Sequence, residues 1–354
     1  MQFRFDWDGV PLATPELPGS GGQIRATVED FRVTEIPAYE PSGEGEHVYL
    51  FVEKRGHTTK FLVEELSRQL GLKTSEVGAA GLKDRHAVTR QWLSVPRRVE
   101  KRLSGFSMPD VTVLQVSAHT NKLGIGHLRG NHFRIRVSGV PDGGAARVEA
   151  VLAKLAVTGV PNSFGPQRFG RQGRNAVRGL ELVQDRRLRG PESISMKRFL
   201  IGSLQSLLFN RYVARRQELG VFDGLLLGDV VKKHDTGGLF TVENAELETG
   251  RAKRLEVSAT GPLYGKKVMP ALGPSRALED EVLAEFNLGW EAFSGRRGSR
   301  RITRVRLEDL DFQPGEGEYW LSFTLPKGSF ATVVLRELTK EPVDAPEDEG
   351  GDDD

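Results

Sequence analysis

The sequence predicts an α+β or α/β protein, because segments with the period of strands and segments with the period of helices follow one another along its 354 residues. Residues 133–137 read FRIRV, so apolar side chains alternate with arginines, as in a strand with one apolar and one basic face. Between residues 59 and 70 leucines recur every four residues and Gly71 follows, as in a helix that ends at glycine. The length also predicts two domains, since single cores rarely grow past ~250–300 residues.

The other elements of the first 160 residues follow from the same two periods. An apolar run at 48–52 predicts a buried strand, and 111–116 predicts another. The sequence PDGG at 141–144 ends the strand that contains 133–137. Apolar residues at i, i+3, i+4 and i+7 then predict an amphipathic helix at 148–155.

After Gly159 the sequence becomes richer in predicted loops and glycine turns. Residues 161–175 predict a basic loop, 221–275 short strands between glycine turns, and 295–301 a basic turn. The remaining predictions are helices at 203–217, 278–288 and 331–338, and strands at 305–307 and 319–325.

Composition indicates an ordinary soluble protein, with 38% hydrophobic and 28% charged residues. The absence of cysteine excludes disulfides, thiolate catalysis and cysteine-ligated zinc. The last fourteen residues hold eight acids and no bases, which predicts a disordered tail. Removing those eight negative charges from the net charge of +2 leaves +10 on the rest of the chain. This charge either attracts a polyanionic partner or only keeps the protein soluble.

Several classes of protein are disfavoured. The N-terminus lacks the basic start and apolar run of a secretory signal, and no stretch approaches the ~18 apolar residues of a membrane helix, so we expect a cytoplasmic protein. The seven histidines are scattered without the spacing of metal ligands, so we expect no metal. Residues 261–267 are similar to a phosphate-binding loop but lack its spacing and its Ser or Thr, and predict a turn.

The stretch AGLKDRHAVTRQ at residues 80–91 carries the clearest chemistry. It places Asp84 between Lys83 and Arg85, with His86 close behind. Neighbouring cations favour the ionised form of a carboxylate, and an ionised carboxylate can act as a nucleophile. The alternative is a solvated turn with charges of both signs.

This stretch resembles the signature of the D family of tRNA pseudouridine synthases. Further blocks of the sequence agree with that family in the same order, at residues 29–59, 128–137, 159–170, 203–216 (more weakly) and 325–338. The resemblance implies an α+β fold, in which a catalytic domain with a largely antiparallel sheet flanked by helices is interrupted by an inserted α/β domain. It places the catalytic domain at 1–160 and 306–340, the insertion at 161–305 and an acidic tail at 341–354.

The activity implied by the resemblance is the isomerisation of uridine 13, in the D-arm of tRNA, to pseudouridine. It implies tRNA as the partner, no cofactor, and a monomer without an obligatory protein partner. Asp84 would be the nucleophile. Arg25 stands where the family has a lysine as the cationic partner of the aspartate. Lys83 is an alternative cation, although on a strand it would point to the face opposite Asp84.

The resemblance also implies a set of substrate-binding residues. Asn131 and Phe133 match the asparagine and stacking aromatic of the family, and positions i and i+2 of a strand share a face. Without the motif, Phe133 is more typical of a core residue than of a contact with substrate. The segment 161–175 can act as a hinge, an RNA-binding wall or both, with Phe169, Arg171 and Arg174 in it. The other predicted substrate-binding residues are Lys83, His86, Phe164, Gln167 and Arg168.

Two other functions are compatible with parts of the sequence. A non-catalytic RNA-binding or RNA-folding module would need the basic surface but not Asp84. A glycosidase would need a second carboxylate near Asp84, which the motif does not supply.

Overall fold

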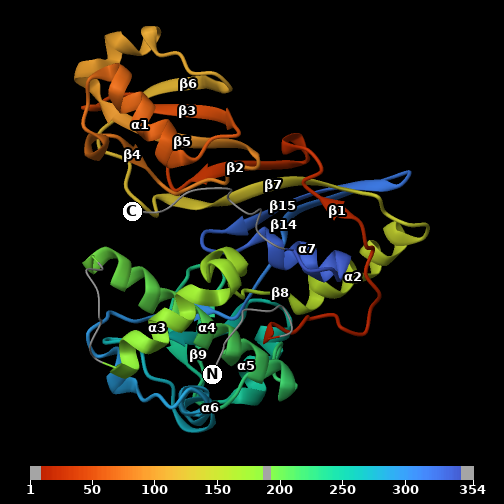
Figure 1. Ribbon diagram of the computed structural model, residues 1–354. Helices are drawn as coiled ribbons and strands as arrows, with labels where there is room; N and C mark the ends of the chain where they lie inside the picture. Colours follow the sequence, from red (N-terminus) through yellow and green to blue (C-terminus); the bar gives the residue numbers. More distant parts are fainter. Residues whose placement is uncertain (1–8, 186–192, 344–354) are drawn as a thin grey trace. The chain divides into compact units, whose positions relative to one another are not determined.

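The computed structural model describes residues 9–185 and 193–343, which pack as two compact units (Figure 1). The first, here called the sheet unit, comprises residues 20–145 and 307–328. The second, the helix-rich unit, takes the rest of the described residues. Residues 146–160 and 329–340 thus pack with the predicted insertion rather than with the sheet. Packing alone does not test which unit is catalytic, so the domain assignment stays a prediction. Most of the predicted tail, 344–354, lies outside the described residues.

The sheet unit is built on a sheet that has nine strands among the described residues. Their order is β14-β15-β7-β2-β5-β3-β6, with β1 also paired to β7 and β4 to β5. Every pairing is antiparallel except that of β2 with β5, so the predicted α+β class with a largely antiparallel sheet is confirmed. The strands are β1 (Gln23–Ile24), β2 (Phe31–Pro37), β3 (His47–Arg55), β4 (Gly78–Ala79), β5 (Val88–Pro96), β6 (Val111–His119), β7 (Leu128–Ser138), β14 (Glu308–Gly315) and β15 (Glu318–Pro326).

Helix α1 (Thr59–Leu70) covers one face of this sheet near β3 and β5 (Figure 1). The Thr58 side chain caps its first turn by accepting a hydrogen bond from the backbone N of Phe61. Its last turn ends at Gly71, which has a φ of 67° that side chains rarely adopt. The leucines of the predicted period are buried against valines and leucines of β3 and β5. The leucine period and Gly71 therefore predicted the bounds of this helix, 59–70, and the structure adds the cap at Thr58.

Strand β7 shows the two faces that its alternation predicts. Phe133, Ile135 and Val137 are buried on one face, whereas Arg134 is exposed on the other and lies 4.8 Å from the ring centre of Trp320. Strands β2, β5 and β14 are not among the elements predicted from periodicity. β14 is exposed and acidic, and its short alternation of Leu310 and Phe312 is followed by Pro314 and Gly315, which disfavour a strand.

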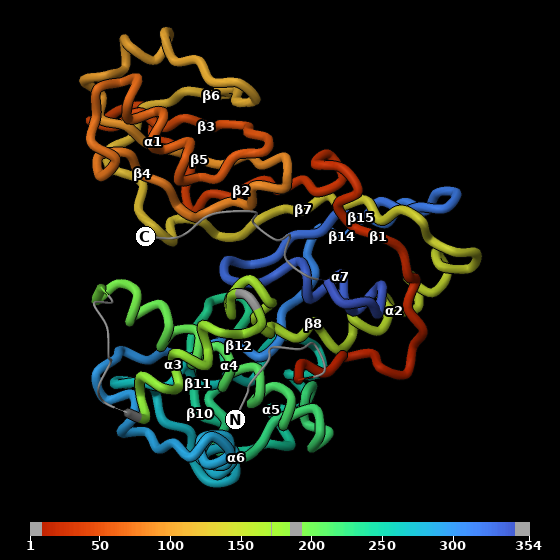
Figure 2. The backbone as a smooth tube through the Cα atoms, in the orientation of Figure 1, coloured from red at the N-terminus to blue at the C-terminus, as the bar shows by residue number. Residues whose placement is uncertain are grey.

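The helix-rich unit packs helices against a small antiparallel sheet of order β10-β9-β11-β12. Helix α4 lies against β11 (Figure 2), and its buried side chains share a core with α6. The α-helices that follow α1 along the chain are α2 (Gly144–Thr158), α3 (Arg174–Asp185), α4 (Ile194–Glu218), α5 (Ala245–Lys253), α6 (Gly273–Glu285) and α7 (Ala331–Thr339). The strands of this unit are β8 (Val160–Pro161), β9 (Val230–Lys233), β10 (Leu239–Thr241), β11 (Val257–Leu263), β12 (Ser299–Ile302) and β13 (Arg304–Val305).

Several predictions for this unit need correction. Residues 221–275 contain the predicted short strands but also α5, whose sequence AELETGRAK has no apolar periodicity and begins after the cap Asn244. The predicted basic turn at 295–301 overlaps the start of β12. Helix α3 begins inside the predicted loop 161–175. Among the described residues, no helix has the length and apolar character needed to cross a membrane.

Candidate active site

The Asp84 carboxylate lies in the loop between β4 and β5 and is held at both oxygens. Arg25 Nη2 donates to Asp84 Oδ2 at 2.6 Å, and the backbone N of His86 donates to Asp84 Oδ1 at 3.0 Å. The Arg25 and Asp84 side chains are only 11% and 18% exposed. The structure therefore pairs Arg25 with Asp84 through a charge-assisted contact between two largely buried side chains.

Arg25 itself is unusually placed. Its φ is 60°, a left-handed conformation that is uncommon outside glycine, and its guanidinium lies 4.3 Å from the ring centre of Phe31. Burial lowers the pKa of Arg25, and the charge of Asp84 acts in the opposite direction. Its Nε and Nη1 are buried and have no hydrogen-bond partner among the described residues. Unpaired buried donors at a strained residue are typical of a site that a ligand completes.

Lys83 contacts a different carboxylate. Its Nζ lies 2.5 Å from Glu35 Oε2 in a buried ion pair, and Glu35 also accepts a hydrogen bond from the backbone N of Trp92. The Lys83 backbone N donates to Thr59 Oγ1 at 2.8 Å. The alternative that Lys83 also pairs with Asp84 is therefore not found. Lys83 anchors the loop beside Asp84, and its role in binding substrate stays a prediction.

Lys54, near the end of β3, is a residue of this site that the sequence analysis missed. It is fully buried, and its Nζ donates to the carbonyl oxygens of Asp84 at 3.0 Å and His57 at 2.5 Å. Burial lowers the pKa of Lys54 from 10.5 to about 8; the charge of Asp84 opposes this change and that of Lys83 adds to it. No sequence signal identifies Lys54, because a lysine near a strand end is ordinarily solvated.

We expect Lys54→Met to weaken the placement of the Asp84 loop, since that loop loses an anchor but no exposed contact. The folded pKa of Lys54 lies below its unfolded value, so the unfolded state binds more protons between pH 8 and 10.5. The stability of the wild type relative to Lys54→Met should therefore rise with pH through that interval, by up to about 1.4 kcal/mol per pH unit. Denaturant unfolding of both proteins at several pH values measures this difference. A difference that stays flat with pH would contradict a buried ammonium at this position.

Asn131 and Phe133 share a face of β7. Phe133 lies opposite Val33 of β2 and Phe323 of β15, and Asn131 lies opposite Glu35 of β2. The Asn131 amide oxygen is buried and has no hydrogen-bond partner among the described residues. It is therefore one of several buried polar atoms of the sheet unit, besides those of Arg25, that a ligand could satisfy.

Phe133 is packed as a core residue. Its side chain is 7% exposed, it stacks on Phe323 with ring centres 5.4 Å apart, and it meets the edge of Phe31 at 6.3 Å. Since Arg25 covers Phe31, these rings connect the Arg25–Asp84 pair to the strand that carries Asn131. Of the two alternatives for Phe133, the packing favours the core, and a contact with substrate stays a prediction.

The predicted residues of segment 161–175 belong to the helix-rich unit. Phe164 is buried, with the Arg301 guanidinium 4.0 Å from its ring centre. Arg168 donates to Ser206 Oγ at 3.0 Å, and burial lowers its pKa. Gln167 is exposed. Phe169 is buried, Arg174 is exposed, and the Arg171 side chain lies outside the described residues. Their roles in RNA binding stay predictions.

Part of the positive charge of the chain is internal. Arg216 and Asp229 form a fully buried ion pair, and Arg300 pairs with Glu279, whose pKa burial raises to about 7. Arg304 is also buried and donates to backbone carbonyls. The partners of Arg216 and Arg300 cancel their charges, so of these three arginines only Arg304 places net positive charge where a polyanion cannot reach it.

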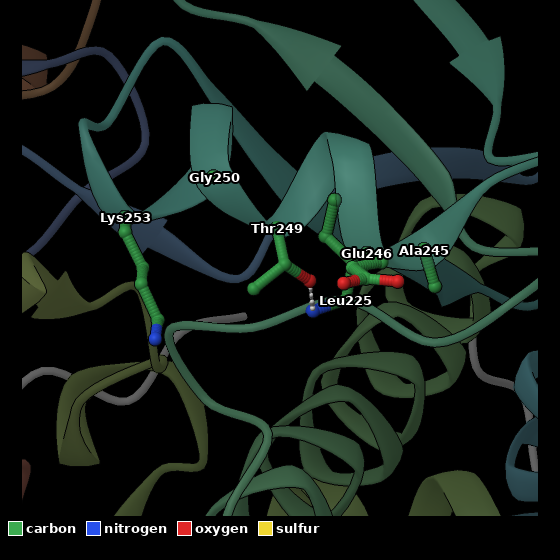
Figure 3. Close-up of a pocket in the computed structure, with 6 residues that line it drawn as sticks. All are labelled: Leu225, Ala245, Glu246, Thr249, Gly250 and Lys253. Atoms are coloured by element: carbon green, nitrogen blue, oxygen red, sulfur yellow. Dashed lines mark hydrogen bonds between the residues drawn. The ribbon is translucent and has the colours of Figure 1, made fainter.

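A surface pocket lies along α5 in the helix-rich unit (Figure 3). The Thr249 hydroxyl accepts a hydrogen bond from the backbone N of Leu225 at its edge, at 3.2 Å. None of the predicted site residues lines this pocket. Within residues 9–185 and 193–343, no cluster of three or more His, Asp or Glu side chains is arranged to hold a metal ion.

The sequence profile of the tRNA pseudouridine synthase D (TruD) family matches residues 9–187 and 193–338. The chain belongs to this family. A tRNA pseudouridine synthase D of Thermus thermophilus is 51% identical over 359 residues, which cover 99% of this chain and 100% of that protein. The protein of the same name from Anaeromyxobacter dehalogenans is 45% identical over 348 residues, covering 96% and 99%.

The fold is also similar to that of a solved TruD family structure. A candidate tRNA pseudouridine synthase D from Methanosarcina mazei superposes with a TM-score of 0.74 at 25% identity, covering 94% of this chain and 97% of that one. The TruD resemblance found in the motifs is therefore confirmed for both sequence and fold.

Proposed function

We propose that this protein isomerises uridine 13 in the D-arm of tRNA to pseudouridine, with Asp84 as the nucleophile. The observation that carries the proposal is the Asp84 carboxylate, held by Arg25 and by the backbone of His86 in a family of tRNA pseudouridine synthases. Because tRNA is the substrate, we place the protein in the cytoplasm. We also propose that it acts as a monomer.

The reaction needs few groups. The bond between uracil N1 and ribose C1′ breaks, the base turns, and a bond between C5 and C1′ forms. N1 gains a proton, and the hydrogen on C5 leaves as a proton. No electrons are exchanged with a second molecule, so the proposed reaction needs no cofactor. The Asp84 carboxylate supplies the nucleophile, and Arg25 pairs with it and positions it.

The unpaired polar atoms of the site suit the edge of uracil. Uracil presents two carbonyl oxygens and one N–H on its ring. The free Nε and Nη1 donors of Arg25 match the carbonyls, and the free amide oxygen of Asn131 matches the N–H. A uridine that is stacked in the RNA must flip out to reach these groups. We assign Arg25 and Asn131 to binding and orienting the flipped base.

The test is tritium release from tRNA transcripts that contain 5-tritiated uridine. We expect wild-type protein to release the tritium of one uridine per tRNA, and a transcript with cytidine at position 13 to release none. Equal release from both transcripts would contradict uridine 13 as the target. Binding in a gel-shift assay without any release would instead support a non-catalytic RNA-binding module.

A further inference from the structure

A groove in the sheet unit adjoins the loop that carries Asp84. Helix α1, strand β4 and the loop around residues 122–125 line it together with Leu82 of the Asp84 loop. Its apolar wall includes Val63, Leu82 and Ile125, and the exposed residues Lys60 and Lys122 stand at its rim. The groove is therefore apolar inside and basic at its edge.

Leu82 and Ile125 are each 78% exposed. Among the described residues, no other large apolar side chain is as exposed as these two. A single exposed leucine needs no explanation, but two such side chains in one groove form a patch that folding does not use. Such patches commonly bind a partner.

The backbone around both side chains is firmly held. Ala80 O accepts a hydrogen bond from the backbone N of Gly126 at 2.7 Å, so the loops of Leu82 and Ile125 are tied together. On the other side of Leu82, Lys83 is fixed by Thr59 and by the buried carboxylate of Glu35. The exposed side chains therefore project from a rigid support, and ordering them on a partner costs little entropy.

We propose that Leu82 and Ile125 contact the nucleobases next to the target uridine and hold open the place that it leaves on flipping. This inference rests on the proposed function. Leu82 is two residues from Asp84, so their Cα atoms are at most about 7 Å apart. Stacked bases are ~3.4 Å apart along a strand, so a side chain at this reach meets the neighbouring bases. Apolar side chains that insert between two stacked bases unstack them, and a base must be unstacked before it can flip out.

The rim explains why the occupant is RNA rather than an apolar peptide. Lys60 and Lys122 line the groove together with the apolar wall, and their ammonium groups suit phosphates flanking the bases. Lys122 also donates to the carbonyl of Ser75, which directs its ammonium group. The groove thus offers the two kinds of contact that a nucleotide can use, an apolar wall for the base and ammonium groups for the phosphate.

The first measurement compares kcat/KM for tritium release from folded tRNA. We expect the double variant Leu82→Ser/Ile125→Ser to lose at least about ten-fold relative to wild type, with an unchanged melting temperature. The matched control is Leu247→Ser on α5, where the leucine is 67% exposed and outside the groove. The control should match wild type. A double variant within two-fold of wild type would overturn the inference.

The second measurement follows flipping directly. Both groove substitutions are placed in the inactive Asp84→Asn background, and saturating protein is added to tRNA with 2-aminopurine 3′ to the target. We expect a large fluorescence rise with Leu82 and Ile125 present and a much smaller rise without them. Equal rises would overturn the inference even if turnover had fallen. Wild type that releases no tritium from any tRNA would defeat the proposed function and the inference together, whereas active wild type with unaffected variants would defeat the inference alone.

Discussion

Replacing Asp84 by asparagine is expected to reduce tritium release from tRNA by at least about a hundred-fold, because the amide is not a nucleophile. The substitution keeps the shape of the side chain, and the asparagine oxygen still accepts from the backbone N of His86. It removes the negative charge opposite Arg25, whose side chain is 11% exposed. We therefore expect a loss of about 1–3 kcal/mol in unfolding free energy. Binding to tRNA should stay close to that of wild type.

The matched control is Asp110→Asn. Asp110 is an exposed aspartate of the same unit with a φ of 58°, a conformation that asparagine tolerates well. We expect this variant to keep both activity and stability. Activity is compared per folded molecule below the melting temperature of each variant. An Asp84→Asn protein that keeps a tenth of wild-type turnover would remove Asp84 from its proposed role.

Replacing Phe133 by alanine is expected to cost about 3–5 kcal/mol of unfolding free energy, the usual effect of emptying a buried aromatic site. The ring is 7% exposed and packs on Phe323 and Phe31, so the neighbours cannot easily close the cavity. If Phe133 were instead a solvent-exposed surface on which the base stacks, its loss would leave the melting temperature unchanged. The observed packing favours the core role and therefore the loss of stability. Denaturant unfolding of the variant measures the cost.

A comparison with Phe323→Ala separates packing from catalysis. Phe323 is fully buried and faces Phe133 across the β7–β15 pair, so both substitutions empty the same cluster. If Phe133 also touches the target base, its loss should lower activity per folded molecule more than the loss of Phe323. Equal activities would confine Phe133 to the core. A stability loss below about 1 kcal/mol in Phe133→Ala would contradict the core packing itself.

The sequence alone determined the features that depend on neighbours along the chain. Helix α1 was predicted from the four-residue leucine period and the terminal Gly71. The buried and exposed faces of β7 needed only alternation, because successive side chains of any strand point to opposite faces. The motif around Asp84, together with the further blocks in the same order, predicted the family, which the comparisons confirm.

The contacts that complete the site were decided by tertiary structure. Arg25 is 59 residues from Asp84 in the chain, and nothing local to either residue brings their side chains together. Lys54 becomes a buried anchor of the Asp84 loop only because β3 pairs with β5, and Lys83 finds Glu35 only because β2 lies beside β5. Phe133 is enclosed by Phe323 of a strand formed near the end of the chain. Sequence period assigns a side chain to a face, but which side chains meet on that face depends on strand order and register, and those are set by packing across the whole sheet.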